Sequence, residues 1–364
     1  MNESLSIVLP TFNERENLPP LLNQIFYLLK EYNLEILIVD DNSTDGTIDL
    51  VKKLANQDSR IRLIRRLGRS GLASAIKEGL LDATGNIAIV MDSDGQHQPS
   101  DVINALQKLT EGDLDVVAGS RFASQSEILG LSNRRKEGST LANYFSGISL
   151  PFNYRGLTDY MTGCFVLNLD KTMETICKVD VNGFKFFYEL LAVSKGRLNV
   201  SEVPLTFQPR LHGKSKLELA VLWDFLISFL HTISFRIMPR RAISFALVGA
   251  SGVFVQLSAT SILTNFFYYK FENILPFSVL VAATSNYLIN NALTFRARRQ
   301  TGLLLLKGLF KFLLVASLPV IANISIAMAF YTNQPDPLLA QIAGIFFGLM
   351  WNYIASSKFV WNTP

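Results

Sequence analysis

The last third of the chain contains four long stretches without a charged residue, and they limit the fold more than any other feature. They cover residues 242–269, 273–295, 312–335 and 337–357. A helix needs roughly 20 apolar residues to cross a bilayer, and each stretch reaches that length. The alternative, buried helices of a large soluble core, would retain polar faces. We therefore predict an all-α membrane domain with spans at about 242–269, 273–295, 310–333 and 337–358.

The two parts of the chain also differ in charge, and the overall mean hydropathy of +0.25 describes neither. From Leu222 onward there are ten Lys and Arg but three Asp and Glu, so the first 221 residues hold 24 basic and 27 acidic residues. In the apolar part, basic residues gather before the first stretch, between the second and third, and after the fourth. Basic loops stay on the cytoplasmic side. We expect both termini and the N-terminal half in the cytoplasm, at the inner membrane in a prokaryote.

The apolar part contains an internal repeat. FALVGAS at 245–251 recurs as FLLVASL at 312–318, and NYLINNALTF at 286–295 recurs as NYIASSKFVW at 352–361. Each half is therefore expected to be a two-helix hairpin. The pattern resembles the GtrA-like family of four-helix membrane domains, over residues 241–364. Residues 217–240 are apolar with few charges and end in a basic cluster, which predicts amphipathic helices on the membrane surface. A soluble packing helix is the alternative.

The first half of the chain alternates short β-branched runs with helical patterns. Strands are expected at 4–10, 35–41, 61–67, 86–92 and 114–120, and helices at 18–32, 44–55, 72–83 and 100–109. Strands that are apolar throughout belong to a sheet covered on both faces, and strand–helix alternation predicts a mostly parallel open sheet. We therefore expect an α/β domain with a Rossmann-like sheet at residues 1–216. Such sheets bind ligands at the carboxyl ends of their strands.

MDSDGQH, at residues 91–97, is the main chemical signal at those strand ends. Two carboxylates at this spacing after an apolar strand can share a hard cation, and Mg²⁺ or Mn²⁺ prefers oxygen ligands completed by substrate phosphates. We expect Asp94 as the first metal ligand, with the amide oxygen of Gln96. Asp92 is expected to bind the metal or a ribose. His97 could be a ligand, but we expect it to support the ligands or to lie at the surface.

Further polar residues follow the first two expected strands. Asp40 and Asp41 could accept hydrogen bonds from a base or ribose, while the residues after them could equally be only a helix cap. The candidates for nucleotide binding at this edge are Pro10, Thr11, Asn13, Glu14, Asp40 and Asp41.

Five motifs carry a family resemblance. They are IVLPTFNERENLPPLL, ILIVDDNSTDGT, VMDSDGQHQP, VAGSRF and EVPLTFQPRLHGKSKL, in this order over residues 4–217. Together they resemble the inverting family 2 glycosyltransferases of GT-A fold, and more narrowly the dolichyl-phosphate mannose synthase and polyprenyl-phosphate glycosyltransferase branch. The resemblance implies transfer of one sugar from a nucleotide sugar to a membrane polyprenyl phosphate. It implies GDP-mannose as the first-choice donor and UDP-glucose as the runner-up.

The acceptor in such a reaction is a phosphate monoester, which is already anionic at pH 7. It needs positioning more than deprotonation, and the planar guanidinium of arginine suits that task. By resemblance, the phosphate is held by Arg121 after the fifth strand and by the pair Arg134 and Arg135, with Ser139. The pair precedes a helical stretch whose start adds backbone donors. Lys136 departs from the usual family pattern, so which arginine contacts the phosphate stays open.

The donor side is assigned by resemblance as well. Arg210 neutralises the donor diphosphate, with residues 213–215 forming a loop over it and Lys216 adding charge. Lys185 and Asp159 reach the sugar, with buried structural pairing as the alternative. The expected catalytic set is thus Asp92, Asp94, Arg121 and Arg210.

Two other functions are alternatives. Processive polysaccharide synthases carry a Gln-x-x-Arg-Trp motif before their membrane helices, and here all three Trp residues lie beyond the catalytic half. A flippase for lipid-linked sugars with a regulatory soluble half is the alternative from another class. The two cysteines, Cys164 and Cys177, exclude a disulfide scaffold. No nucleic-acid partner is expected, and a homo-oligomer is left open.

Overall fold

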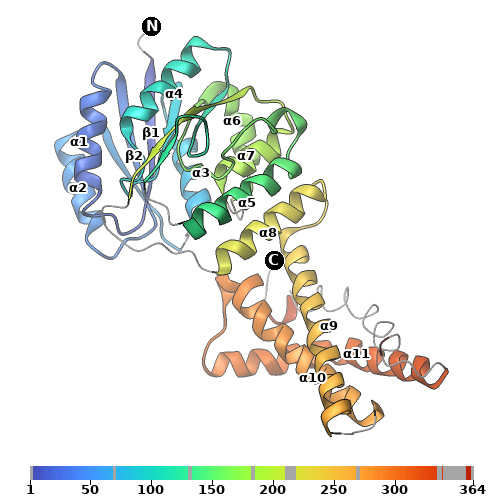
Figure 1. Cartoon of the computed structure of the whole chain (residues 1–364). Coiled ribbons are helices and arrows are strands. Elements are labelled where there is room, and N and C mark those ends of the chain that lie inside the picture. Colours follow the sequence, from blue (N-terminus) through green and yellow to red (C-terminus); the bar gives the residue numbers. More distant parts are fainter. Residues whose placement is uncertain are drawn as a thin grey trace. The chain divides into compact units, whose positions relative to one another are not determined.

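The computed structural model describes residues 3–68, 71–129, 133–181, 185–209, 219–267, 271–333, 338 and 358–361. By its internal contacts the chain divides into two units, Met1–Ile233 and Ser234–Pro364. Figure 1 shows a sheet flanked by helices in the first unit and helices alone in the second. Each unit is described separately below.

A seven-stranded mixed sheet forms the centre of the first unit, with the strand order β3-β2-β1-β4-β7-β5-β8. Strand β7 is antiparallel to both of its neighbours, and the other four pairings are parallel. The prediction of a mostly parallel α/β sheet is confirmed at this level, although β7 and β8 were not predicted. The strands are β1 (Ser4–Thr11), β2 (Asn33–Asp40), β3 (Ile61–Arg65), β4 (Ile87–Val90), β5 (Val116–Ser120), β7 (Phe165–Asn168) and β8 (Val200–Pro204).

Helices cover both faces of this sheet because its strands are apolar on both sides. Along β1, Leu5, Ile7 and Leu9 pack into one core and Val8 packs into the other, with the period of two that a strand imposes. One core is closed by α1 (Leu18–Leu28), α2 (Thr47–Gln57) and α4 (Pro99–Glu111). The other is closed by α3 (Leu72–Asp82), α6 (Leu169–Lys178) and α7 (Phe186–Ser194). The four helices predicted from the sequence are present within a few residues of their expected bounds.

The remaining elements of the first unit lie outside the main sheet. Strands β6 (Glu127–Ile128) and β9 (Thr206–Phe207) form a short parallel pair. Helix α5 (Asn133–Ser149) is followed by the short helix η1 (Phe152–Tyr154), and α8 (Leu219–Ile233) ends the unit. Phe145 of α5 meets Phe229 of α8 edge-on, with ring centroids 5.5 Å apart. Helix α8 therefore packs against α5.

The described residues of the second unit form helices joined by turns, without a strand. It contains α9 (Arg240–Phe267), α10 (Phe271–Ile289) and α11 (Leu303–Asn333), with the short turns η2 (Asn290–Thr294) and η3 (Arg296–Arg298) between the last two. These helices cover the first three predicted spans. Within the described part of the chain, one helix, Arg240–Asn265, is long and apolar enough to cross a membrane. Nearly all of the fourth predicted span lies outside the described residues.

Candidate active site

The carboxyl ends of β1, β2 and β4 bring the predicted polar residues to one edge of the sheet. Thr11, the last residue of β1, is in register with Asp40, and its carbonyl accepts the amide of Asp41 at 2.9 Å. On the other side of β1, the hydroxyl of Ser93 donates to the carbonyl of Pro10 at 2.8 Å. The ends of these three strands therefore form one continuous polar edge.

The loops after β1 and β2 are joined by side-chain hydrogen bonds. The amide of Asn13 donates to Ser43 Oγ at 2.8 Å, and the amide of Thr44 donates to Asn13 Oδ1 at 2.9 Å. Asn13 has a φ of +59°, a left-handed conformation that asparagine tolerates better than most residues. Asp40 is fully buried, and Ser43 donates its amide and its hydroxyl to the two carboxylate oxygens. Asp40 thus shapes the turn between β2 and α2, and Gly46, without a side-chain cap, stands at the N-cap of α2.

Asp41 is the carboxylate that this turn leaves near the surface. It accepts a hydrogen bond from the amide of Gly71 at 2.7 Å and forms an ion pair with Arg66, whose side chain is fully buried. Burial raises the pKa of Asp41 above its ordinary value, although Gly71 and Arg66 act in the opposite direction. Arg66 is not among the predicted site residues, because the sequence of residues 61–67 predicts only a strand. The available signal is an arginine directly after the half-buried strand β3.

Asp92, Asp94 and Gln96 lie on the loop between β4 and α4. Gly95 has a φ of +75°, which favours glycine and lets this loop turn sharply. Asp94 Oδ1 accepts the amide of Gln96 at 3.1 Å. Gln96 Nε2 donates to the carbonyl of Gln208 at 3.1 Å, so the amide nitrogen faces Gln208 and the oxygen is the atom that a cation would meet.

This donor set suits Mg²⁺ or Mn²⁺, since two carboxylates and an amide oxygen are hard ligands. Within the described ranges, no group of three or more His, Cys, Asp and Glu residues is placed to hold a metal. The predicted set of Asp92, Asp94 and Gln96 is compatible with that finding, because its third member is an amide. Substrate phosphate oxygens would complete the coordination.

Asp92 lies among positive groups and is half-buried. Burial alone would raise its pKa, but the hydrogen bond and charge of His97, followed by the charges of Lys185 and Arg121, lower the pKa of Asp92 below its ordinary value. The charges of Lys185 and Arg121 therefore both act on Asp92. A Cβ atom at Gly163 would overlap the carboxylate of Asp92, so a larger residue there would displace that carboxylate.

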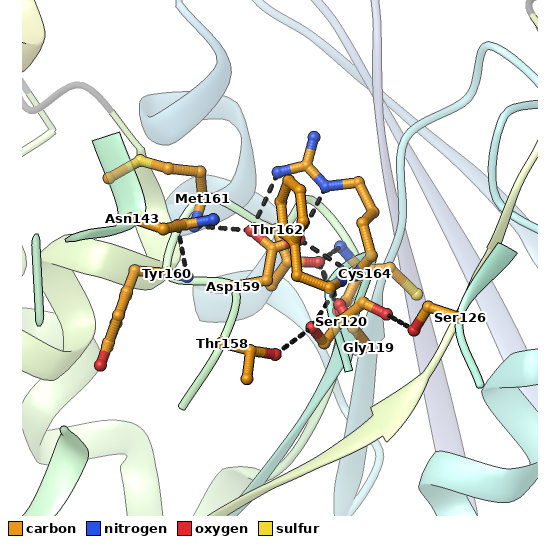
Figure 2. A network of polar contacts seen from close by, with 12 residues as sticks. Gly119, Ser120, Ser126, Asn143, Thr158, Asp159, Tyr160, Met161, Thr162 and Cys164 are labelled. Atoms are coloured by element: carbon orange, nitrogen blue, oxygen red, sulfur yellow. Dashed lines mark hydrogen bonds and ion pairs between the residues drawn. The ribbon is translucent and has the colours of Figure 1, made fainter. Parts of the chain in front are cut away.

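Arg121 forms a bidentate ion pair with Asp159. Its Nε and Nη2 donate to the two carboxylate oxygens at 2.7 and 2.9 Å, and its backbone amide donates to the same carboxylate at 3.2 Å. Asp159 is fully buried, and in Figure 2 it lies between its neighbours Thr158 and Thr162 and the end of β5. The alternative of buried structural pairing therefore holds for Asp159. The other terminal nitrogen of Arg121, Nη1, carries two further donors.

The same network holds α5 in place. The amide of Tyr160 donates to Asn143 Oδ1 at 3.0 Å, a contact drawn in Figure 2. Arg134 and Arg135 lie in the first turn of α5, not before the helix as expected, and Ser139 is half-buried on the next turn. The side chains of the two arginines, and the whole of Arg210 and Lys216, lie outside the part of the chain that the structure describes.

Two protein families match the chain. Glycosyl transferase family 2 matches residues 6–174, and the GtrA/DPMS transmembrane domain matches residues 244–361. The dolichol-phosphate mannosyltransferase of Pyrococcus furiosus is 29% identical over 362 residues, which cover 99% of each chain. That of Saccharomyces cerevisiae is 32% identical over 240 residues, which cover 62% of this chain and 85% of the yeast one.

Solved structures give weaker likenesses. The glucosyl-3-phosphoglycerate synthase of Mycobacterium tuberculosis, in complex with Mn²⁺, UDP and glucosyl-3-phosphoglycerate, is 18% identical with a TM-score of 0.47, covering 64% of this chain and 80% of that chain. The mannosyl-3-phosphoglycerate synthase of Rubrobacter xylanophilus is 17% identical with a TM-score of 0.46, covering 65% of this chain and 74% of that chain. The family assignment rests on the sequence relatives: the chain belongs to the dolichol-phosphate mannosyltransferase family and is a membrane protein that joins a family 2 glycosyltransferase domain to a GtrA/DPMS transmembrane domain.

Proposed function

We propose that the protein transfers one mannosyl residue from GDP-mannose to the phosphate of a membrane dolichyl or polyprenyl lipid, with inversion at the anomeric carbon. The observation that carries this proposal is the relative from Pyrococcus furiosus, a dolichol-phosphate mannosyltransferase that this chain matches over 99% of both lengths. The match includes the catalytic edge of the sheet and the transmembrane domain together. The products are the lipid-phosphate sugar and GDP.

The donor lies, in this proposal, along the polar edge formed by β1, β2 and β4. Asp41 is the carboxylate at that edge suited to accept hydrogen bonds from a guanine base. Pro10, Thr11, Asn13 and Glu14 line the start of the same edge. Lys185, Arg210 and Lys216 provide positive charge for the diphosphate and its sugar.

Asp92, Asp94 and Gln96 hold Mg²⁺ or Mn²⁺ in this proposal. When bound, the cation would neutralise charge on the leaving diphosphate. The buried pair between Arg121 and Asp159 fixes the guanidinium near Asp92 without using its Nη1 donors. A fixed arginine of this kind can orient the acceptor phosphate without a change in its own geometry.

The acceptor lipid approaches, in this proposal, over helices α5 and α8. The first turn of α5 carries Arg134 and Arg135, which would bind the phosphate together with Arg121 and Ser139. Farther along the same two helices, large apolar side chains are exposed, as expected for a surface that meets lipid. They are Leu141, Tyr144 and Ile148 of α5 and Leu222 and Leu226 of α8. We further propose four spans, with the catalytic unit and the C-terminus in the cytoplasm.

The test is incubation of membranes containing the protein with a panel of radiolabelled nucleotide sugars and polyprenyl phosphate. We expect label to enter the lipid phase from GDP-mannose, and to remain in the aqueous phase with Asp94→Asn. Label entering from UDP-glucose instead would reassign the donor. No lipid label from any donor, or full activity of Asp94→Asn, would overturn the proposal.

A further inference from the structure

His97 is a buried side chain whose role follows from the different surroundings of its two ring nitrogens. It is 3% exposed, and its Nε2 lies 3.4 Å from Oδ2 of Asp92. Its Nδ1 is buried and has no hydrogen-bond partner among the described residues. Buried polar atoms normally have partners, so an exception calls for an explanation.

His97 packs against the short strand β9. Residues His97 and Phe207 form a β-bridge, and their rings meet edge-on with centroids 5.5 Å apart. The neighbouring residues add two hydrogen bonds. The backbone amide of Gln208 donates to the carbonyl of Gln96 at 2.9 Å, and the side-chain Nε2 of Gln96 donates to the carbonyl of Gln208 at 3.1 Å. The backbone bridge and the ring of Phe207 thus hold the imidazole of His97 beside the carboxylate of Asp92.

A cavity of about 360 Å³ lies beside this ring. His97 lines it together with Gly95 and Gln98 of its own loop, the start of α1, and residues 208–209. Asn17, also in the lining, has a buried Oδ1 without a partner among the described residues. The cavity is large enough for several waters or a small heterocycle, because one water needs only about 10–15 Å³ of such volume.

We propose that His97 is a positioning residue for the metal site, whose Nε2–H holds the carboxylate of Asp92 in the orientation that lets it share a cation with Asp94 and Gln96. The inference rests on the proposed function, since it takes these three residues as the metal ligands. An ionised carboxylate only accepts hydrogen bonds, so Nε2 must carry the hydrogen in this pair. Nδ1 takes no part in this contact, and it has no hydrogen-bond partner among the described residues.

The test measures Mn²⁺ affinity of the full chain in detergent, from the electron paramagnetic resonance of free Mn²⁺, without substrates. His97→Phe keeps the ring volume but removes the donor, and we expect Mn²⁺ binding about 10–100-fold weaker, as for other residues that orient metal ligands. His97→Gln can place its amide nitrogen where Nε2 stands, so it should bind Mn²⁺ nearly as wild type does. His97→Asn places the same amide nearer the position of Nδ1 and should behave like His97→Phe.

A chemical rescue separates positioning from a general loss of structure. His97→Ala joins the space of the ring to the cavity, and added imidazole should restore its Mn²⁺ affinity but not that of His97→Phe. Wild-type affinity in His97→Phe, or equal loss in the Gln, Asn and Phe variants, would overturn the inference. Asp94→Asn serves as the separate control: if it binds Mn²⁺ as tightly as wild type, the metal site itself is wrong and the proposed function loses its metal as well.

Discussion

At the scale of single residues, the contact between Gly163 and Asp92 leads to a prediction. Gly163→Ala places a methyl group against the carboxylate that we assign to the metal. We expect Mn²⁺ affinity and transferase activity to fall at least tenfold, with a loss of about 1–3 kcal/mol in the free energy of unfolding from overpacking. Gly156→Ala is the matched control, because a Cβ atom there meets nothing within 4 Å. Equal behaviour of the two variants would contradict the assignment.

The bidentate pair of Arg121 and Asp159 gives a second prediction at this scale. Asp159→Asn leaves a buried guanidinium without its counter-charge, which typically costs about 3–5 kcal/mol of stability. Arg121→Lys keeps the charge but loses the fork geometry. We therefore expect Arg121→Lys to raise the KM for lipid phosphate more than the KM for GDP-mannose. Thermal unfolding of both variants measures the loss of stability, and kinetic assays of both measure the two KM values. An unchanged lipid KM would remove Arg121 from the acceptor site.

At the scale of elements, the exposed apolar face of α5 can be tested separately from the chemistry. Tyr144→Gln combined with Ile148→Gln should leave transfer to a short, soluble prenyl phosphate unchanged. Transfer to a long polyprenyl phosphate in vesicles should fall several-fold, because less apolar area is then available to enter the interface. Tyr27→Gln on α1 is the control, since Tyr27 is 76% exposed and Tyr144 is 65% exposed. Equal loss with both acceptors would assign α5 a purely structural role.

Some elements of the first unit can be predicted from the sequence and others cannot, for physical reasons. The strands β1 and β2 and the helices packed on them follow from local apolar periodicity, which a short window contains. Strand β7 does not, because its four residues pair antiparallel with β4 and β5, which lie far away in the sequence. The residues of the site likewise divide into those that a local motif identifies and those that depend on distant segments. Asp92 and Asp94 are recognisable from one motif, whereas the pairing of Arg121 with Asp159 depends on a loop 38 residues away.

At the scale of the whole molecule, the division after Ile233 predicts what a truncated protein retains. Both sheet cores and the described polar edge lie within Met1–Ile233, so this fragment should fold. We expect it to bind GDP and Mn²⁺ about as tightly as the full chain, measured by calorimetry. Transfer to long-chain lipid in vesicles should be strongly reduced. Loss of nucleotide binding in a folded fragment would show that the transmembrane domain contributes to the donor site.

The reversed strand β7 also has a consequence for how the chain folds as it is synthesised. Strands β3, β2, β1 and β4 are all complete by residue 90 and can pair as soon as they emerge. Strand β5 emerges next, but both of its neighbours in the sheet, β7 and β8, are made later. Long-range pairing is slow and leaves edges exposed meanwhile. In the growing chain, β5 and one edge of β4 therefore stay unpaired until β7 has been made. A chain that ends before residue 165 would have an exposed, unpaired strand edge at β4.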